Sequence, residues 1–483
     1  MVGVILTPKV ESPVQILVNK PLQSMEKRKL LLAYLALIGT PVLLLLGVLA
    51  IGKEFHAPHL AVDIPVSGAQ ERPAASVSLL LLVGQIGAVV LASRVVGYAF
   101  RAIGQPQVVG EMLAGILLGP SFLGVIAPGI SATLFPASSM GMLGGISQLG
   151  LILFMFMVGL ELNPRELYEH GEATVLISHV SIVAPFMLGS LLSLYLYPRL
   201  SNDSVSFMSF TLFMGAAMSI TAFPVLARIL SARRLLRTRL GTIAIGCAAV
   251  DDVSGWCILA GIVALIRSAQ SAVSVWMTLA GLAVFLCVMI LVVRPMLTSI
   301  GRFYRERGHL SDDLLAATLL LAFIGAFSTE ALGLHLLFGA FVAGAVMPKD
   351  VRFVAYLTEK VETVTVLFLL PLFFAFTGLR TRVGLVQGGE MWFYCILIIA
   401  VAVIGKVGGT SVAARIGGFD WRHSAALGIL MNTRGLMELV ILNVGLDLKV
   451  ISPTLFSMMV MMALVTTVMT TPLLKLIRLP DRD

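Results

Sequence analysis

The chain has 483 residues, of which 58% are apolar and only 12% are charged, and its formal net charge is +8. A soluble globular protein carries about twice that share of charged residues, so the composition excludes an ordinary soluble protein. Apolar runs of about 18 residues or more follow one another, which is typical of transmembrane helices. The basic excess therefore indicates loops beside an anionic lipid surface, not nucleic-acid binding.

We predict an all-α polytopic membrane protein with about fourteen transmembrane helices. The predicted spans are 30–52, 76–100, 106–126, 141–161, 173–198, 206–231, 241–266, 272–296, 312–331, 333–348, 360–380, 391–415, 423–445 and 453–476. The first is too long for a signal-peptide core, so it is expected to be retained. The span at 333–348 is short, as in a tilted or partly re-entrant helix.

Basic residues divide unevenly between the two sides of these spans. With the N-terminus inside, the inside segments hold 25 Lys and Arg residues and the outside loops hold 7. Lys and Arg accumulate in cytoplasmic loops. We therefore expect both termini, including the tail at 1–29, to be cytoplasmic.

Neither the cysteines nor any phosphate-binding motif indicates a cofactor. Cys247, Cys257, Cys287 and Cys395 lie in apolar runs and form no CxxC pair. They are expected to be small buried hydrophobes, neither disulfide-bonded nor metal-ligating. No Walker-type loop is present, so a nucleotide partner is not expected either.

Three charged residues fall deep inside predicted spans, where a charge is costly and usually functional. Asp251 lies about ten residues into its span, roughly 15 Å deep, next to Asp252, and Lys406 is similarly deep in another span. A buried carboxylate can hold a proton or a small cation, but hardly both at once. Lys406 can pair with one aspartate and release it, or the pair can be purely structural, which leaves the second carboxylate unpaired in hydrocarbon.

Two spans also carry residues that interrupt a helix. The first contains Thr221 and Pro224, and the second contains Asn432, Thr433, Arg434, Gly435 and Glu438. Arg434 and Glu438 can pair four residues apart, or neutralise half-helix dipoles. The interrupted spans are the sixth and thirteenth, and an offset of seven inverts orientation, so an ion site between inverted repeats is predicted.

Seven segments together resemble the monovalent cation/proton antiporter-2 family, which includes bacterial sodium/proton antiporters and plant cation/proton exchangers. They are QPQVVGEMLAGILLGPSFLG (105–124), LGLILFMFMVGLELNPREL (149–167), TAFPVLARIL (221–230), VDDVSGW (250–256), GLHLLFGAFVAGAVMP (333–348), LPLFFAFTGLR (370–380) and MNTRGLMELVILNVGL (431–446).

The resemblance implies thirteen family helices preceded by one extra helix at 30–52. It implies a core domain with crossed interrupted helices (173–266 and 391–476), a dimerisation domain (76–161 and 312–380) and a linker helix at 272–296. A homodimer in the plasma or inner membrane and an elevator-type movement are implied as well. By match to the acidic motif, Asp252 would be the essential cation- and proton-binding carboxylate, and Asp251 with Lys406 looks like the electrogenic sodium type.

The resemblance is divided on the ion. The double aspartate favours Na⁺, whereas the segment at 431–446 is similar to plant K⁺ exchangers. Three other readings remain: a sodium-coupled organic-anion symporter on a related fold, a passive cation channel, and an intramembrane aspartyl protease. A protease would take its two acids from different helices that converge on one water, whereas Asp251 and Asp252 are adjacent on one helix, about 100° apart. A channel would need a repeated selectivity element, and the sequence shows none.

Overall fold

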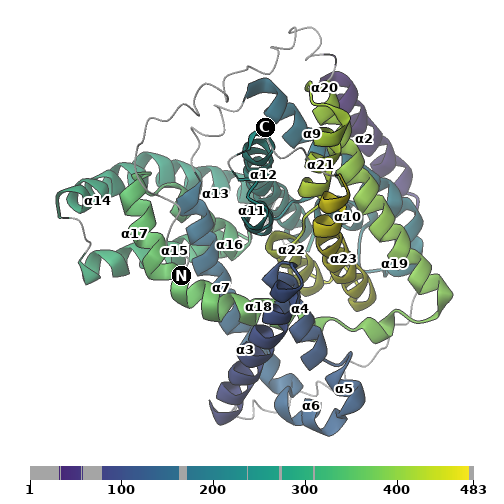
Figure 1. The fold of residues 1–483 in the computed structure, drawn as a ribbon, viewed down its shortest axis with the longest axis horizontal. Helices are drawn as coiled ribbons and strands as arrows, with labels where there is room; N and C mark the ends of the chain where they lie inside the picture. The colour runs from purple at the N-terminus through teal and green to yellow at the C-terminus, as the bar shows by residue number, and fades with distance from the viewer. Residues whose placement is uncertain are drawn as a thin grey trace.

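The computed structural model describes residues 34–55, 79–162, 171–236, 238–270, 275–307 and 311–477, together with Leu32 and Ala57. The predicted tail at 1–29 lies outside these residues. All regular structure within them is helical, which confirms the all-α prediction (Figure 1).

Twelve helices in the described part of the chain are long and apolar enough to cross a membrane, and a bent pair makes a thirteenth. The predicted count of fourteen is therefore approximate. The difference lies at 333–348, where α16 (Leu336–Ala345) has only 10 residues. A straight helix needs about 20 residues to cross the hydrocarbon core, so α16 is too short to cross alone.

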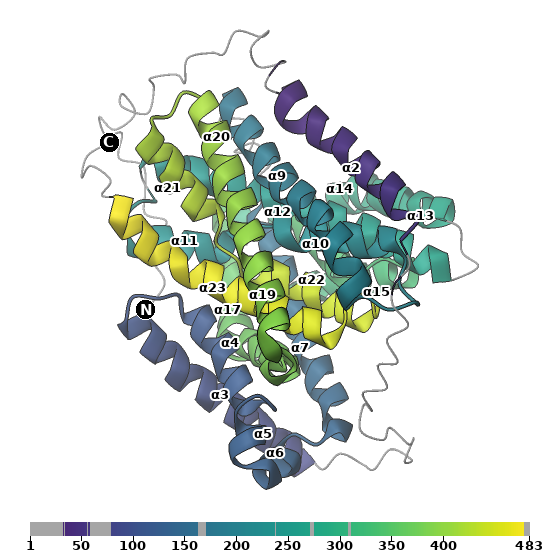
Figure 2. The same ribbon diagram turned by 90° about the vertical axis from the view of Figure 1, so that its right-hand side faces the viewer.

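One group of helices, the site bundle, packs mainly within itself. It consists of α9 (Gly171–Leu200), α10 (Phe207–Ser219), α11 (Phe223–Ala232), α12 (Arg239–Gln270), α19 (Gly388–Val403), η6 (Ile404–Gly408), α20 (Gly409–Ile416), α21 (Trp421–Met431), α22 (Leu436–Asp447) and α23 (Pro453–Ile477). The extra N-terminal helix, η2 (Leu35–Gly39) and α2 (Thr40–Gly52), packs along α9 at its edge (Figure 2).

A second group, the companion bundle, packs beside it. It consists of α3 (Leu79–Ala102), α4 (Gln107–Leu118), α7 (Ala137–Glu161), α15 (Asp312–Ala331), α16, α17 (Val351–Val364), η4 (Thr365–Leu369) and α18 (Leu370–Arg380). Short helices α5 (Leu123–Ile126) and α6 (Pro128–Leu134) follow α4. The segment α13 (Val275–Val288), η3 (Met289–Val293) and α14 (Arg294–Arg307) connects the bundles in sequence.

Glycines allow the companion helices to pack backbone to backbone. A Cβ on Gly115 of α4 would lie 2.2 Å from the carbonyl oxygen of Ala375 in α18. A Cβ on Gly378 would lie 2.6 Å from the carbonyl oxygen of Met112 in α4. Small residues at such crossings are typical of helix packing in membranes.

The cysteine prediction is half right. All four thiols are free, and Cys247 and Cys395 are buried. Cys257 and Cys287 are exposed instead, because they lie on outward faces of α12 and α13. An apolar run alone does not show which face of a membrane helix points into the protein and which points to lipid.

Candidate ion-binding site

The two interrupted spans cross at their breaks. Residues 220–222 separate α10 from α11, and residues 432–435 separate α21 from α22, whose axes differ by 43°. The amide of Ala222 donates a hydrogen bond of 2.9 Å to the carbonyl of Thr433. A Cβ on Gly435 would lie 2.8 Å from Val225 and 3.1 Å from the Cβ of Ala222, so the crossing needs glycine there.

Thr221 and Pro224 have different roles at the first break. The hydroxyl of Thr221 lies 2.8 Å from both the carbonyl of Met431 and the Oδ2 of Asp251, so it connects the two breaks to α12. The position of Pro224 in the sequence suggested that it removes a hydrogen bond within a helix, but it does not. It sits in the first turn of α11, where the amide has no helical partner anyway.

The contacts of Arg434 fit both interpretations of this residue, a pair with Glu438 and neutralisation of a half-helix dipole. Its guanidinium donates to the carbonyls of Ala217 (2.9 Å) and Met218 (2.6 Å) at the C-terminal end of α10. It also pairs with Glu438 at 3.2 Å, and both side chains are buried. A cation at a helix C-terminus offsets the partial negative charge of the exposed carbonyls.

Asn432 and Thr433 complete the second break. The hydroxyl of Thr433 donates to the carbonyl of Leu430 at 2.7 Å. The amide of Asn432 donates to Gly428 at 3.1 Å, while its side-chain Oδ1 is buried without a partner. These bonds end α21 inside the protein, where irregular backbone is tolerated because its polar groups are satisfied by neighbouring groups.

Asp251 is fully buried and surrounded by donors. Lys406 Nζ lies 2.8 Å from its Oδ2, Ser181 Oγ lies 2.9 Å from Oδ1, and Ser178 Oγ lies 3.2 Å from Oδ1. With Thr221, four side chains from α9, η6 and the break before α11 donate to this one carboxylate. Each donor satisfies an oxygen that would be costly to leave unpaired in the interior.

Asp252 differs sharply from its neighbour in the chain. It is 4% exposed and its Oδ1 has no hydrogen-bond partner. The backbone amide of Phe223, at the N-terminus of α11, interacts with this carboxylate. The positive end of a helix dipole therefore faces it, but no cationic side chain is bonded to it in the described residues. The ion pair thus leaves the second carboxylate available.

Lys406 is held in place by backbone as well as by Asp251. It lies on η6, a π-helical turn, and Nζ also donates to the carbonyls of Ser181 (2.8 Å) and Ser219 (2.5 Å). Single π turns within α-helices often mark functional sites. A Cβ on Gly405 would lie 2.8 Å from the Cα of Pro185, so glycine here lets η6 approach α9.

The buried charges around the crossing do not cancel. Three carboxylates and two cations are buried: Asp251, Asp252, Glu438, Lys406 and Arg434. With all five ionised, the cluster carries one net negative charge. Uptake of one proton or one monovalent cation neutralises it, which suits a site where either can bind.

Some residues of the site were not predicted. Ser178 and Ser181 lie three apart on α9 and both face Asp251. Thr467 of α23 accepts from the amide of Arg434 at 3.1 Å and donates to its carbonyl at 2.8 Å. Ser and Thr are common between membrane helices, so their spacing alone carried little signal.

Comparisons with known proteins show the family to which the chain belongs. The model of the family described as "Sodium/hydrogen exchanger, transmembrane" matches residues 87–476. A relative named Na(+)/H(+) antiporter NhaS4, from Synechocystis sp., is 44% identical over 82% of this chain and 97% of its own length. Cation/H(+) antiporter 17 of Arabidopsis thaliana is 41% identical over 84% of this chain, which spans 49% of that protein.

Further matches agree with the fold and the family. K(+)/H(+) antiporter 1 of Saccharomyces cerevisiae is 34% identical over 83% of this chain and 46% of its own length. The solved structure of the sodium proton antiporter MjNhaP1 from Methanocaldococcus jannaschii superposes with a TM-score of 0.60, at 15% identity, over 82% of this chain and 96% of that one. The proteins so named are transporters, not enzymes. This multi-pass membrane chain belongs to the sodium/hydrogen exchanger family.

Proposed function

We propose that the chain exchanges a monovalent cation, Na⁺ in preference to K⁺, for protons across the membrane. The observation that carries the proposal is the buried Asp252, which has an unpartnered oxygen in a cluster that holds one more carboxylate than basic side chains. A proton and a cation compete for that oxygen. Competition at a site that opens to each side in turn yields exchange without further machinery.

Asp251 and Lys406 regulate that competition in the proposed cycle. In the arrangement described, Lys406 neutralises Asp251, so Asp252 alone faces an incoming ion. A cation that draws on both carboxylates displaces Lys406 from Asp251. The lysine can then give up a proton, which supplies a second proton per cation and makes the exchange electrogenic.

The oxygen ligands of the site support Na⁺. The names of the relatives support Na⁺ in one case and K⁺ in another. Carboxylate, hydroxyl and carbonyl oxygens suit hard cations in general. The name of the Synechocystis relative specifies Na(+), and that of the yeast relative specifies K(+). Two adjacent carboxylates favour the smaller, more strongly attracted ion. The family favours neither the organic-anion symporter nor the channel.

Alternating access is proposed to come from a movement of the site bundle against the companion bundle, with the companion bundle forming a homodimer interface. The helices of each bundle make their most extensive contacts within their own bundle, as expected for two units that move relative to one another. We further propose a plasma or inner membrane location with both termini in the cytoplasm, on the basis of the Lys and Arg distribution.

Proteoliposomes that contain a pH-sensitive dye test the function. With an imposed proton gradient, addition of Na⁺, Li⁺ or K⁺ should dissipate the gradient, most strongly with Na⁺. Asp252→Asn should abolish dissipation by every cation, because the amide takes up no proton. Valinomycin with K⁺ gradients tests whether the Na⁺ response depends on voltage. Full exchange by Asp252→Asn would refute the proposal.

A further inference from the structure

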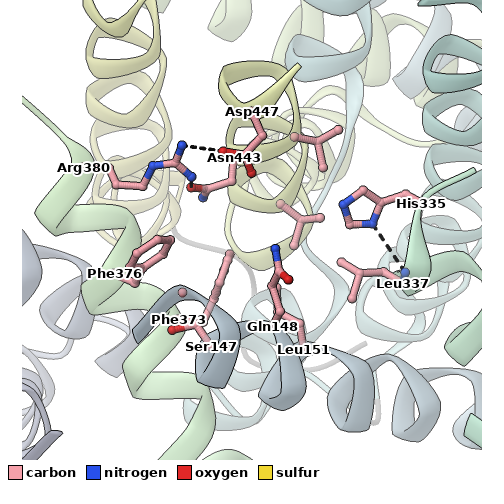
Figure 3. A pocket seen from close by; sticks show the side chains of 13 residues that line it. Ser147, Gln148, Leu151, His335, Leu337, Phe373, Phe376, Arg380, Asn443 and Asp447 are labelled. Atoms are coloured by element: carbon pink, nitrogen blue, oxygen red, sulfur yellow. Dashed lines mark hydrogen bonds and ion pairs between the residues drawn. The ribbon is translucent and has the colours of Figure 1, made fainter. Parts of the chain in front are cut away.

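Polar side chains cross the boundary between the bundles at the ends of α18 and α22. Arg380 of α18 donates to Asn443 Oδ1 at 2.9 Å and to Asp447 Oδ1 at 2.5 Å (Figure 3). One turn deeper, Asn443 Nδ2 donates to Thr377 Oγ1 at 2.8 Å. We name these four residues, Thr377, Arg380, Asn443 and Asp447, the clasp.

A second ion pair joins the bundles at the same end. Arg267 of α12 pairs with Glu330 of α15 at 2.9 Å, and Glu330 also accepts from the amide of Leu336 at 3.1 Å. His335 lines a cavity together with Arg380 and Asp447, and it directly precedes Leu336, so both ion pairs lie near His335. Two ion pairs therefore connect the bundles at this end of the boundary.

A small cavity lies beneath the clasp, between α7, α16, α18 and α22 (Figure 3). Its volume is about 30 Å³, enough for a water molecule. Gln148 lines it and is exposed, although it lies midway along a membrane-spanning helix. An amide at that depth is favoured where water, not lipid, reaches it.

The lining of the cavity extends along α22 from the clasp in the direction of the helix crossing, as far as Val440. Val440, Asn443, Val444 and Asp447 line it with the three- and four-residue spacing of one helix face. Asn443 is eight residues beyond Gly435, which is about 12 Å along the helix. This face of α22 therefore leads from the crossing to the C-terminal end of the helix, where the clasp lies.

We propose that Arg380 is a positioning residue: it holds α22 against α18, closes this end of the path to the site, and releases when the site opens in that direction. The inference rests on the proposed exchange and adds to it the residues that control one access route. Arg380 forms its hydrogen bonds with Asn443 and Asp447, away from Asp251 and Asp252.

The burial of the clasp suits a contact that breaks and re-forms. The side chains of Arg380 and Asp447 are 21% and 51% exposed, and exposed ion pairs contribute little to stability. The Asn443–Thr377 bond behind them is buried and neutral. When the clasp opens, water that enters the cavity can form hydrogen bonds with all four side chains. No charged side chain is then left without a partner.

A reversible crosslink tests whether the clasp must open. Thr377→Cys/Asn443→Cys, in a background without the four native cysteines, should form a disulfide when oxidised, because the two side chains are in hydrogen-bond contact. Oxidation should abolish cation/proton exchange, and dithiothreitol should restore it. Undiminished exchange by the crosslinked protein would overturn the proposal.

The matched control crosslinks two helices of the same bundle. Ser193 of α9 and Thr211 of α10 are also buried and lie 2.7 Å apart. Ser193→Cys/Thr211→Cys should crosslink without loss of exchange, because these helices move together. Inhibition by this pair as well would show that any crosslink stops transport, which removes the support for the clasp.

A labelling measurement tests the clasp without transport. Val440 is 2% exposed beneath it, so Val440→Cys should react slowly with a charged thiol reagent. If the open state is a minor population of up to about 10%, Arg380→Gln should raise the labelling rate by up to about fivefold. Arg380→Lys should keep the slow rate, and Ser193→Cys should label equally slowly with or without Arg380→Gln.

An unchanged rate at Val440→Cys in Arg380→Gln would overturn the clasp even if exchange is normal. Conversely, a protein that shows the labelling change but exchanges no cation for protons would retain the clasp and refute the proposed function. The two failures are therefore distinguishable.

Discussion

Two ion pairs with similar chemistry occupy opposite environments in this protein. Lys406 and Asp251 lie 2.8 Å apart with side chains that are 0% exposed, whereas Arg380 and Asp447 lie 2.5 Å apart and are 21% and 51% exposed. Removal of one partner from a buried pair leaves an uncompensated charge. Removal of one partner from an exposed pair leaves a hydrated one. Burial therefore suits the first pair to a binding site and the second to a releasable contact.

The largest expected effect on stability is at the buried pair. Lys406→Ala leaves Asp251 charged in the interior, and the carbonyls of Ser181 and Ser219 lose their hydrogen bonds to Lys406. It should therefore destabilise the protein by about 3–5 kcal/mol. Denaturant unfolding in mild detergent measures this. The control Lys475→Ala, at an exposed lysine, should change stability by less than about 0.5 kcal/mol.

A double variant sharpens that result. Lys406→Ala with Asp251→Ala removes both charges, so it should recover part of the stability lost by Lys406→Ala alone. If the two losses simply add, the pair is not energetically coupled, and the contrast with the exposed pair fails.

A smaller effect is expected from one donor to Asp251. Ser181→Ala removes the hydroxyl that lies 2.9 and 3.0 Å from the two carboxylate oxygens and should cost about 2 kcal/mol. It should also shift the cation concentration for half-maximal exchange, because Asp251 becomes less well solvated. Ser193→Ala, on the same helix but bonded to Thr211, should leave that concentration unchanged.

The smallest stability change is expected at the exposed pair. Arg380→Gln should alter the free energy of unfolding by at most about 1 kcal/mol, because water replaces the lost partner of Asp447. A loss as large as that of Lys406→Ala would show that burial does not separate the two pairs. Unfolding curves for both variants in the same detergent make the comparison direct.

The sequence indicated the centre of the candidate site more clearly than its surroundings. Asp251, Asp252 and Lys406 stood out because charges deep within apolar spans are rare and costly. The two breaks stood out through Thr221 and the polar run at 432–435. Asp251 and Asp252 point in directions about 100° apart on α12, so the rotation of this helix decides which of them pairs with Lys406. The sequence alone does not specify that rotation.

Other features were hidden because their sequence signal is common. Ser178 and Ser181 look like ordinary small residues of a membrane helix. Arg380 and Asp447 lie at span ends, where charged residues are normally solvated, and they meet only because α18 and α22 end side by side. The exposed Cys257 and the short α16 depend on packing, which apolar composition does not specify.

Proton release on cation binding tests the shared site most directly. The purified protein in weakly buffered detergent solution, near neutral pH, should release protons when NaCl is added, but not when choline chloride is added. Asp252→Asn should release far fewer. Equal release by Asp252→Asn, or Na⁺ binding by the unaltered protein with no proton release, would contradict competition of the two ions at this carboxylate.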